Sequence, residues 1–201
     1  EPHSFSSSAR RIRLSALTMQ GDQAQILALL SDIAGKNVIP ESERQARVNT
    51  AVSRQLAQLK NASEIFATLE ALPKQLKSES MVESAAFSSL LLSDQPAKAV
   101  EYYKRKYKGE WPWSAIQALD TAPDSAISAI SVKEVGAMLG EKAETAVGLA
   151  LQGRVLVSEK LWGKAKQVLE RSYKLNPASR SALSLGKFCH AMGEHDAAIE
   201  W

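Results

Sequence analysis

The chain repeats itself with a period of 33 residues in its last third, and this spacing constrains the fold more than any other feature. Gly153 and Gly186 are 33 positions apart, as are Ala165 and Ala198. Ala99 precedes Ala165 by two such periods. Small residues at fixed intervals suit points where two helices cross closely, because protein interiors leave no room for a larger side chain there. A period of this length is typical of stacked pairs of antiparallel helices.

Glycine and proline breaks divide the rest of the chain into further helical segments. We predict twelve helices, near residues 8–20, 22–34, 41–59, 63–72, 78–93, 96–108, 112–120, 124–139, 142–158, 161–175, 179–192 and 195–201. No alternating run between turn residues is long enough to indicate a strand. The expected fold is therefore all-α, a right-handed superhelical solenoid of about six antiparallel helix pairs. Residues 1–62 would form degenerate N-terminal helical repeats, continuous with the repeats of 63–201, which are clearest over 146–178 and 179–201.

The segment GEHDAAIEW (193–201) resembles the tetratricopeptide repeat (TPR) consensus, with Gly193 in the turn, Asp196 near the helix start and Ala198 at the crossing. Three longer stretches, LEALPKQLKSESMVESAAFSSLL (69–91), KAVEYYKRKYKGEW (98–111) and LALQGRVLVSEKLWGKAKQVLERSYKLNP (149–177), are similar to the C-terminal TPR region of HemY-type proteins. These are inner-membrane proteins of proteobacteria associated with haem biosynthesis. The resemblance implies a TPR-like solenoid, an N-terminal membrane anchor that this chain does not contain, and a binding or scaffolding role.

The composition fits a globular chain, with 45% hydrophobic and 23% charged residues among 201. A net charge of +3 is too small to argue for nucleic acid, and one cysteine excludes an internal disulfide.

The first eight residues lack an apolar core, so no signal peptide is expected, although a removed leader or a missing anchor stays open. With an anchor before residue 1, Arg10, Arg11 and Arg13 would favour a cytoplasmic domain. The chain ends at Trp201 in mid-repeat, so we expect the natural protein to continue, or another surface to cover this end.

The concave face of a TPR-like solenoid is the expected binding site, because the first helix of each pair lines it. In the last two repeats the lining positions are Val147, Ala150, Arg154, Val157, Ser158, Arg180, Leu183, Lys187, His190 and Ala191. We expect Arg154, Arg180, Lys187 and His190 to converge there, with no acid among these positions. Such a cluster suits a carboxylate from a peptide C-terminus, an acidic segment or porphyrin propionates. The alternative is ordinary solvated charge.

Catalytic and metal-binding patterns give no further candidates. The chain has no Ser/His/Asp order, HExxH motif, phosphate loop or GxGxxG motif, so we expect neither catalytic residues, a metal site nor an enzyme. Cys189 adjoins His190, but neighbouring helical residues point about 100° apart and do not easily share one ion. We expect Cys189 in the core as a small hydrophobe. His190 stays open as an axial haem ligand, and otherwise no cofactor is expected.

The stretch YYKRKYKGEWPW (102–113) is basic and aromatic, yet its helical spacing opposes a nucleic-acid site. Tyr103 and Tyr107 share a face with Ala99 and should pack inward. Lys104, Arg105 and Lys108 should point outward as a solvated face, with an anionic membrane as the first alternative and RNA as the second.

The sequence thus predicts a non-enzymatic TPR protein that holds a protein or peptide partner in its groove. By resemblance, haem-pathway enzymes are the expected partners, at the inner membrane. A general envelope or assembly scaffold and a direct haem carrier are the alternatives.

Overall fold

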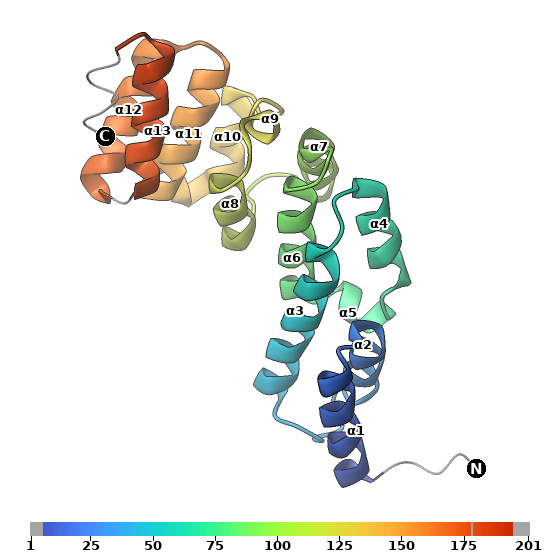
Figure 1. Cartoon of the computed structure of the whole chain (residues 1–201). Coiled ribbons are helices and arrows are strands. Elements are labelled where there is room, and N and C mark those ends of the chain that lie inside the picture. Colours follow the sequence, from blue (N-terminus) through green and yellow to red (C-terminus); the bar gives the residue numbers. More distant parts are fainter. Residues whose placement is uncertain (1–5, 178, 195–201) are drawn as a thin grey trace. The chain divides into compact units, whose positions relative to one another are not determined.

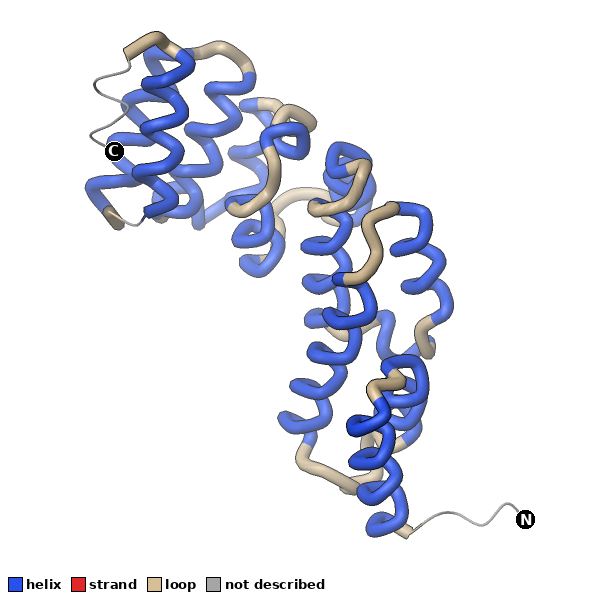
Figure 2. The backbone as a smooth tube through the Cα atoms, in the orientation of Figure 1, coloured by secondary structure: helices blue, strands red, loops and turns tan. Residues whose placement is uncertain are grey.

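The computed structural model describes residues 6–177 and 179–194, and every regular element within these ranges is a helix (Figures 1 and 2). The all-α prediction is confirmed. Two compact units make up the chain, Glu1–Asp94 and Gln95–Trp201. The boundary between degenerate and clearer repeats, expected at 62/63, falls inside the first unit. The helix that begins there, Ala62–Ala71, packs against the later helix Ser80–Leu91 of the same unit.

The first unit is built around a long central helix. Its elements are α1 (Ser7–Gln20), α2 (Gln23–Asp32), α3 (Glu41–Ala57), α4 (Ala62–Ala71), α5 (Lys74–Lys77) and α6 (Ser80–Leu91). Helix α3 packs against α2 and α6, and α6 also contacts α4 and α5. The buried Arg44 guanidinium on α3 pairs with Glu41 at 2.6 Å and with Glu79, just before α6, at 2.8 Å. Because a buried charge needs such partners, this cluster ties the starts of α3 and α6 together.

The second unit is built around α11, which contacts most of the other helices of that unit. The elements are α7 (Pro96–Lys106), α8 (Trp113–Asp120), α9 (Asp124–Ile127), α10 (Val132–Leu139), the 3₁₀ turn η1 (Gly140–Glu144), α11 (Ala146–Ser158), α12 (Trp162–Leu175) and α13 (Ser179–Ala191). Helix α11 packs against α8, α9, α10, α12 and α13. Its central place follows from its composition, since apolar residues and glycines occupy nearly every side of it.

The 33-residue period of the sequence is also a period of helix starts. Helices α6, α8, α11 and α13 begin at Ser80, Trp113, Ala146 and Ser179, each 33 positions after the one before. Helices α7 and α12 begin two periods apart, at Pro96 and Trp162. The spacing seen in the sequence is therefore also a spacing of helix starts in the described residues.

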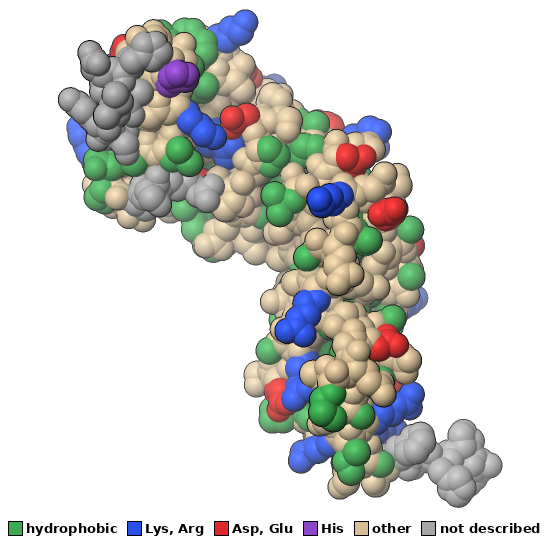
Figure 3. Space-filling model, viewed as in Figure 1, with side chains coloured by type: hydrophobic (Ala, Val, Ile, Leu, Met, Phe, Trp, Pro, Cys, Tyr) green, Lys and Arg blue, Asp and Glu red, His purple; other side chains and the backbone are tan. Residues whose placement is uncertain are grey.

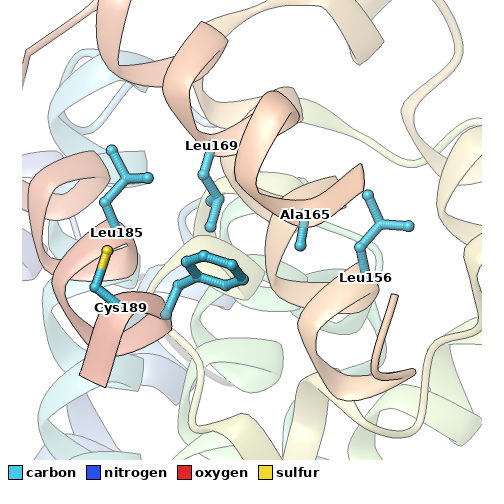
Figure 4. Packing of buried hydrophobic residues seen from close by; sticks show 6 residues of the cluster. Leu156, Ala165, Leu169, Leu185 and Cys189 are labelled. Atoms are coloured by element: carbon cyan, nitrogen blue, oxygen red, sulfur yellow. The ribbon is translucent and has the colours of Figure 1, made fainter. Parts of the chain in front are cut away.

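Small residues bring α11 and α12 into close contact, as the repeat predicts. Gly153 is buried, and a Cβ added to it would collide with the Leu169 side chain. Ala165 is fully buried and belongs to the hydrophobic cluster that joins α11, α12 and α13, together with Leu156, Leu169, Leu185 and Cys189 (Figure 4). Both predicted positions are thereby confirmed. Gly186 is half-buried, and Ala198 and the predicted helix 195–201 lie outside the described residues.

The single helix predicted over 124–139 is wrong, because the chain breaks after α9 and restarts at α10. Ser131 caps α10: its hydroxyl accepts from the Glu134 N–H, and the Glu134 carboxylate accepts from the Ser131 N–H at 2.8 Å. The freed Ala129 carbonyl accepts from Lys104 at 2.7 Å. This reciprocal capping box satisfies the backbone groups that the break exposes.

The helix expected over 142–158 begins later, at Ala146, because the Thr145 hydroxyl caps it by accepting from the Gly148 N–H. The residues before it form η1 instead. A Cβ at Gly148 would collide with the Lys142 carbonyl oxygen of that turn, so only glycine fits where η1 folds against α11.

The aromatic residues of α7 pack inward, but one of its lysines does so too. Tyr103 and Trp111 are buried, and Tyr107 is half-buried between them, with its ring centroid 5.8 Å and 5.9 Å from theirs. The outward orientation predicted for Lys104 is wrong, since its ammonium bonds to Ala129, Glu101 and Glu134. The cation is held there because it matches two carboxylates and a helix-end carbonyl.

Candidate binding cavity

A cavity of about 400 Å³ opens in the second unit between α11, α13 and the turn that joins α8 to α9. Six of the ten positions expected on the concave face line it, namely Arg154, Val157, Ser158, Leu183, Lys187 and Ala191. The remaining walls come from Asp120–Asp124, Ile127, Leu169, Ser184 and Phe188. Ala150, another of the ten positions, is buried and does not line the cavity.

Arg154 anchors one wall of the cavity. Its guanidinium donates to the carbonyl oxygens of Leu119, Asp120 and Ala122 at 3.2, 2.9 and 2.6 Å, and to the Asp124 carboxylate at 2.8 Å. Leu119 and Asp120 are the last residues of α8, where helical carbonyls run out of N–H partners, and Ala122 follows in the turn. The Leu119 carbonyl also accepts from the Ala122 N–H at 3.0 Å. A cation is favoured at this end of a helix. Arg154 thus fixes the turn between α8 and α9 against α11.

These contacts leave only 14% of the Arg154 side chain exposed, so Arg154 lines the cavity as a largely buried cation. An acid from outside the ten expected lining positions also reaches the cavity. Asp124, the first residue of α9, lies between Arg154 and Lys187, and its Oδ2 is 4.0 Å from the Lys187 Nζ. Asp124 lies about 30 residues before Arg154, so the spacing of one repeat face gave no signal for it.

The charged side chains at the cavity mouth differ in how closely they are paired within the chain. The hydrogen bond from Arg154 lowers the pKa of Asp124 against the effect of burial, and the charges of Arg154 and Lys187 lower it further. Asp124 is therefore ionised at neutral pH and neutralises Arg154. The Lys187 side chain is 63% exposed and lies beyond hydrogen-bond distance of Asp124. Lys187 is the cation at this mouth that can accommodate an incoming acceptor.

The inner surface of the cavity is mainly apolar. Val157 from α11, Ile127 from α9 and Phe188 from α13 contribute aliphatic and aromatic surface, and Leu183 is 54% exposed at the edge. A mainly apolar hollow of roughly 300–1,000 Å³ with a few polar groups is the usual form of a binding pocket. This one suits an apolar side chain with a hydrogen-bonding group beside it.

His190 is the other predicted site residue whose side chain is described, and it does not line the cavity. It is exposed on α13, while Cys189 is buried as expected. The Arg180 side chain lies outside the described residues. In the part of the chain that the structure describes, no group of three His, Cys, Asp or Glu residues could hold a metal ion.

Basic and acidic side chains are scattered over the visible surface, without a broad patch of either sign there (Figure 3). Among the described helices, none combines the length and the apolar character that a membrane span requires. No protein family model matches the chain, and neither does a curated protein or a solved structure.

Proposed function

We propose that this chain is a non-enzymatic, TPR-like binding protein that holds a short segment of a protein partner in the cavity between α11 and α13. The observation that carries the proposal is the agreement between the repeat and the cavity. Six of the ten positions chosen for their place on one face of two successive 33-residue units line the same apolar hollow. Stacked helix pairs form such concave surfaces and commonly use them to bind partners.

The contacts at the mouth favour a partner segment with an apolar anchor beside an acceptor group. The apolar residue would fill the space between Val157 and Phe188, and Lys187 would donate to a carboxylate or carbonyl of the partner. Arg154 is committed to the α8 carbonyls, so it would shape the site without binding the partner itself.

The titratable groups of the cavity support binding over catalysis. General acid–base catalysts work best with a pKa near the operating pH. The pKa of Asp124 is shifted in the opposite direction, and Arg154 is held in four hydrogen bonds. Both groups therefore act as fixed structural charges in this proposal.

Selection of random peptides displayed on phage, using the immobilised full chain, tests the proposal. We expect the enriched peptides to share an apolar residue next to an acidic or amide residue. Leu183→Glu should weaken their binding at least about tenfold, because it places a charge at the apolar edge of the cavity. Leu175→Glu is the matched control, since Leu175 is 60% exposed on α12 and does not line the cavity.

Equal binding of the selected peptides to both variants would place the site elsewhere.

We propose haem-pathway enzymes at the inner membrane as the first natural partners to test, a choice that rests on the sequence resemblance. The carrier alternative predicts a Soret shift on haem titration that His190→Ala removes, and that result would replace the peptide-binding proposal.

A further inference from the structure

Helix α7 presents a basic surface that the proposed function does not use. Its buried side carries Ala99, Val100 and Tyr103. The exposed side chains of Lys98, Tyr102, Arg105 and Lys106 on the helix, and of Lys108 just after it, form what we call the α7 basic surface. Residues 98, 102 and 105 fall on one face because they are four and three positions apart.

The cations of this surface exceed the acids near them. In the described part of the chain, Lys98, Arg105 and Lys108 form no ion pair or hydrogen bond through their side chains. The nearby acids are already matched, Glu101 with Lys104 at 2.9 Å and Glu110 with Lys142. The positive charge here is therefore not neutralised within the chain, and it suits an anionic partner.

An exposed tyrosine lies among these cations. The Tyr102 side chain is 49% exposed, and its ring packs edge-on against the buried Tyr103, with centroids 5.5 Å apart and planes at 72°. A phenol combines an apolar ring with a polar tip, and such side chains favour the boundary between lipid and water. The long stems of lysine and arginine behave in a similar way.

We propose that the α7 basic surface docks on an anionic lipid bilayer. Basic residues near such a bilayer each strengthen attachment by roughly fivefold at moderate salt. A single-stranded RNA partner is the weaker fit, since base stacking needs several accessible rings. Of the other aromatic residues in this stretch, Tyr103 and Trp111 are buried and Tyr107 is half-buried, so Trp113, 37% exposed at the start of α8, is the one further accessible ring.

Flotation of the full chain with lipid vesicles tests this proposal. Neutral vesicles of phosphatidylcholine are compared with vesicles containing about one-third phosphatidylglycerol, at low and high NaCl. The parent should partition onto the anionic vesicles at least about tenfold more strongly, and added salt should release it. Tyr102→Ser should also weaken attachment, because it removes an apolar contact with the bilayer. The loss that this substitution causes should depend little on the salt concentration, since no charge is removed.

The triple variant Lys98→Glu/Arg105→Glu/Lys108→Glu should fall to the level seen with neutral vesicles. The matched control is Lys133→Glu/Lys164→Glu/Lys174→Glu, which reverses three exposed lysines on α10 and α12 and changes the net charge equally. It should stay within about threefold of the parent, since these charges lie off the surface. Circular dichroism checks that both variants are helical, and the salt release of the parent supports the proposal without any variant.

Three results would overturn the proposal. The parent could ignore anionic vesicles, or both triple variants could lose attachment equally, which would reflect net charge alone. The third result would be that a single-stranded RNA oligomer binds to the α7 basic surface while vesicles do not. The α7 basic surface would then be a nucleic-acid-binding site.

Discussion

Gly153 on α11 and Leu169 on α12 meet so closely that a Cβ at position 153 would collide with the leucine side chain. This contact sets how near the two helices can approach, and it lies directly beside the cavity wall that Leu169 contributes. The fold of the repeat and the shape of the candidate site therefore depend on the same glycine.

Replacing Gly153 by alanine should destabilise the second unit. The added methyl group must displace Leu169 in a tightly packed core, at a cost of roughly 1–3 kcal/mol in the free energy of unfolding. Urea denaturation measures the change. Gly163→Ala is the control, because Gly163 is an exposed glycine of α12 with open space around it. That substitution should be neutral or stabilise by up to about 1 kcal/mol.

Arg154→Met should destabilise the protein much more than Lys187→Met. The first change removes the charged donor from the carbonyls of Asp120 and Ala122, while the Leu119 carbonyl keeps the Ala122 N–H. The cost should be roughly 2–4 kcal/mol, since hydrogen bonds to charged groups contribute more than neutral ones. Lys187 is mostly exposed, and its loss should cost less than about 0.5 kcal/mol. Similar unfolding midpoints for the two variants would mean that Arg154 does not hold the α8–α9 turn.

The capping box at Ser131 predicts a pH dependence. Hydrogen bonds from Ser131, opposed by burial and assisted by Lys104, lower the pKa of Glu134 from 4.5 to about 2. A carboxyl group with a depressed pKa stabilises the fold fully above its unfolded value, and this contribution is lost as the pH falls through about 4.5 towards about 2. At neutral pH the parent should therefore be more stable than Glu134→Gln, by less than about 1 kcal/mol because the side chain is partly exposed. The difference should shrink on acidification, and a constant difference would show that the carboxylate charge plays no part.

The sequence predicted the parts of the structure that arise within one repeat. Gly153 and Ala165 were identified from their spacing, because close packing of paired helices restricts these positions to small residues. The start of a new helix at α10 could also be predicted from the sequence, since Ser131 and Glu134 have the spacing of a capping box. The prediction of one helix over 124–139 rests on the breakers Pro123 and Gly140 and does not take this capping signal into account.

The charge arrangement of the cavity could not be predicted in this way. Asp124 and Arg154 meet through the turn between α8 and α9, whose path depends on tertiary contacts and not on the period. Lys104 was misplaced for the same reason, because its partners Ala129 and Glu134 come from an interruption of the repeat. Repeat spacing identifies which face a residue occupies, but not which distant groups meet it there.

The central claim is that the cavity between α11 and α13 is the binding site, and amide chemical-shift mapping tests it most directly. A peptide enriched in the display selection is titrated into the isotopically labelled full chain. The largest shifts should fall at Val157, Leu183, Lys187 and Phe188, and Leu183→Glu should abolish them while Leu175→Glu leaves them unchanged. Shifts that cluster in the first unit or on α7, or that survive in Leu183→Glu, would contradict the account.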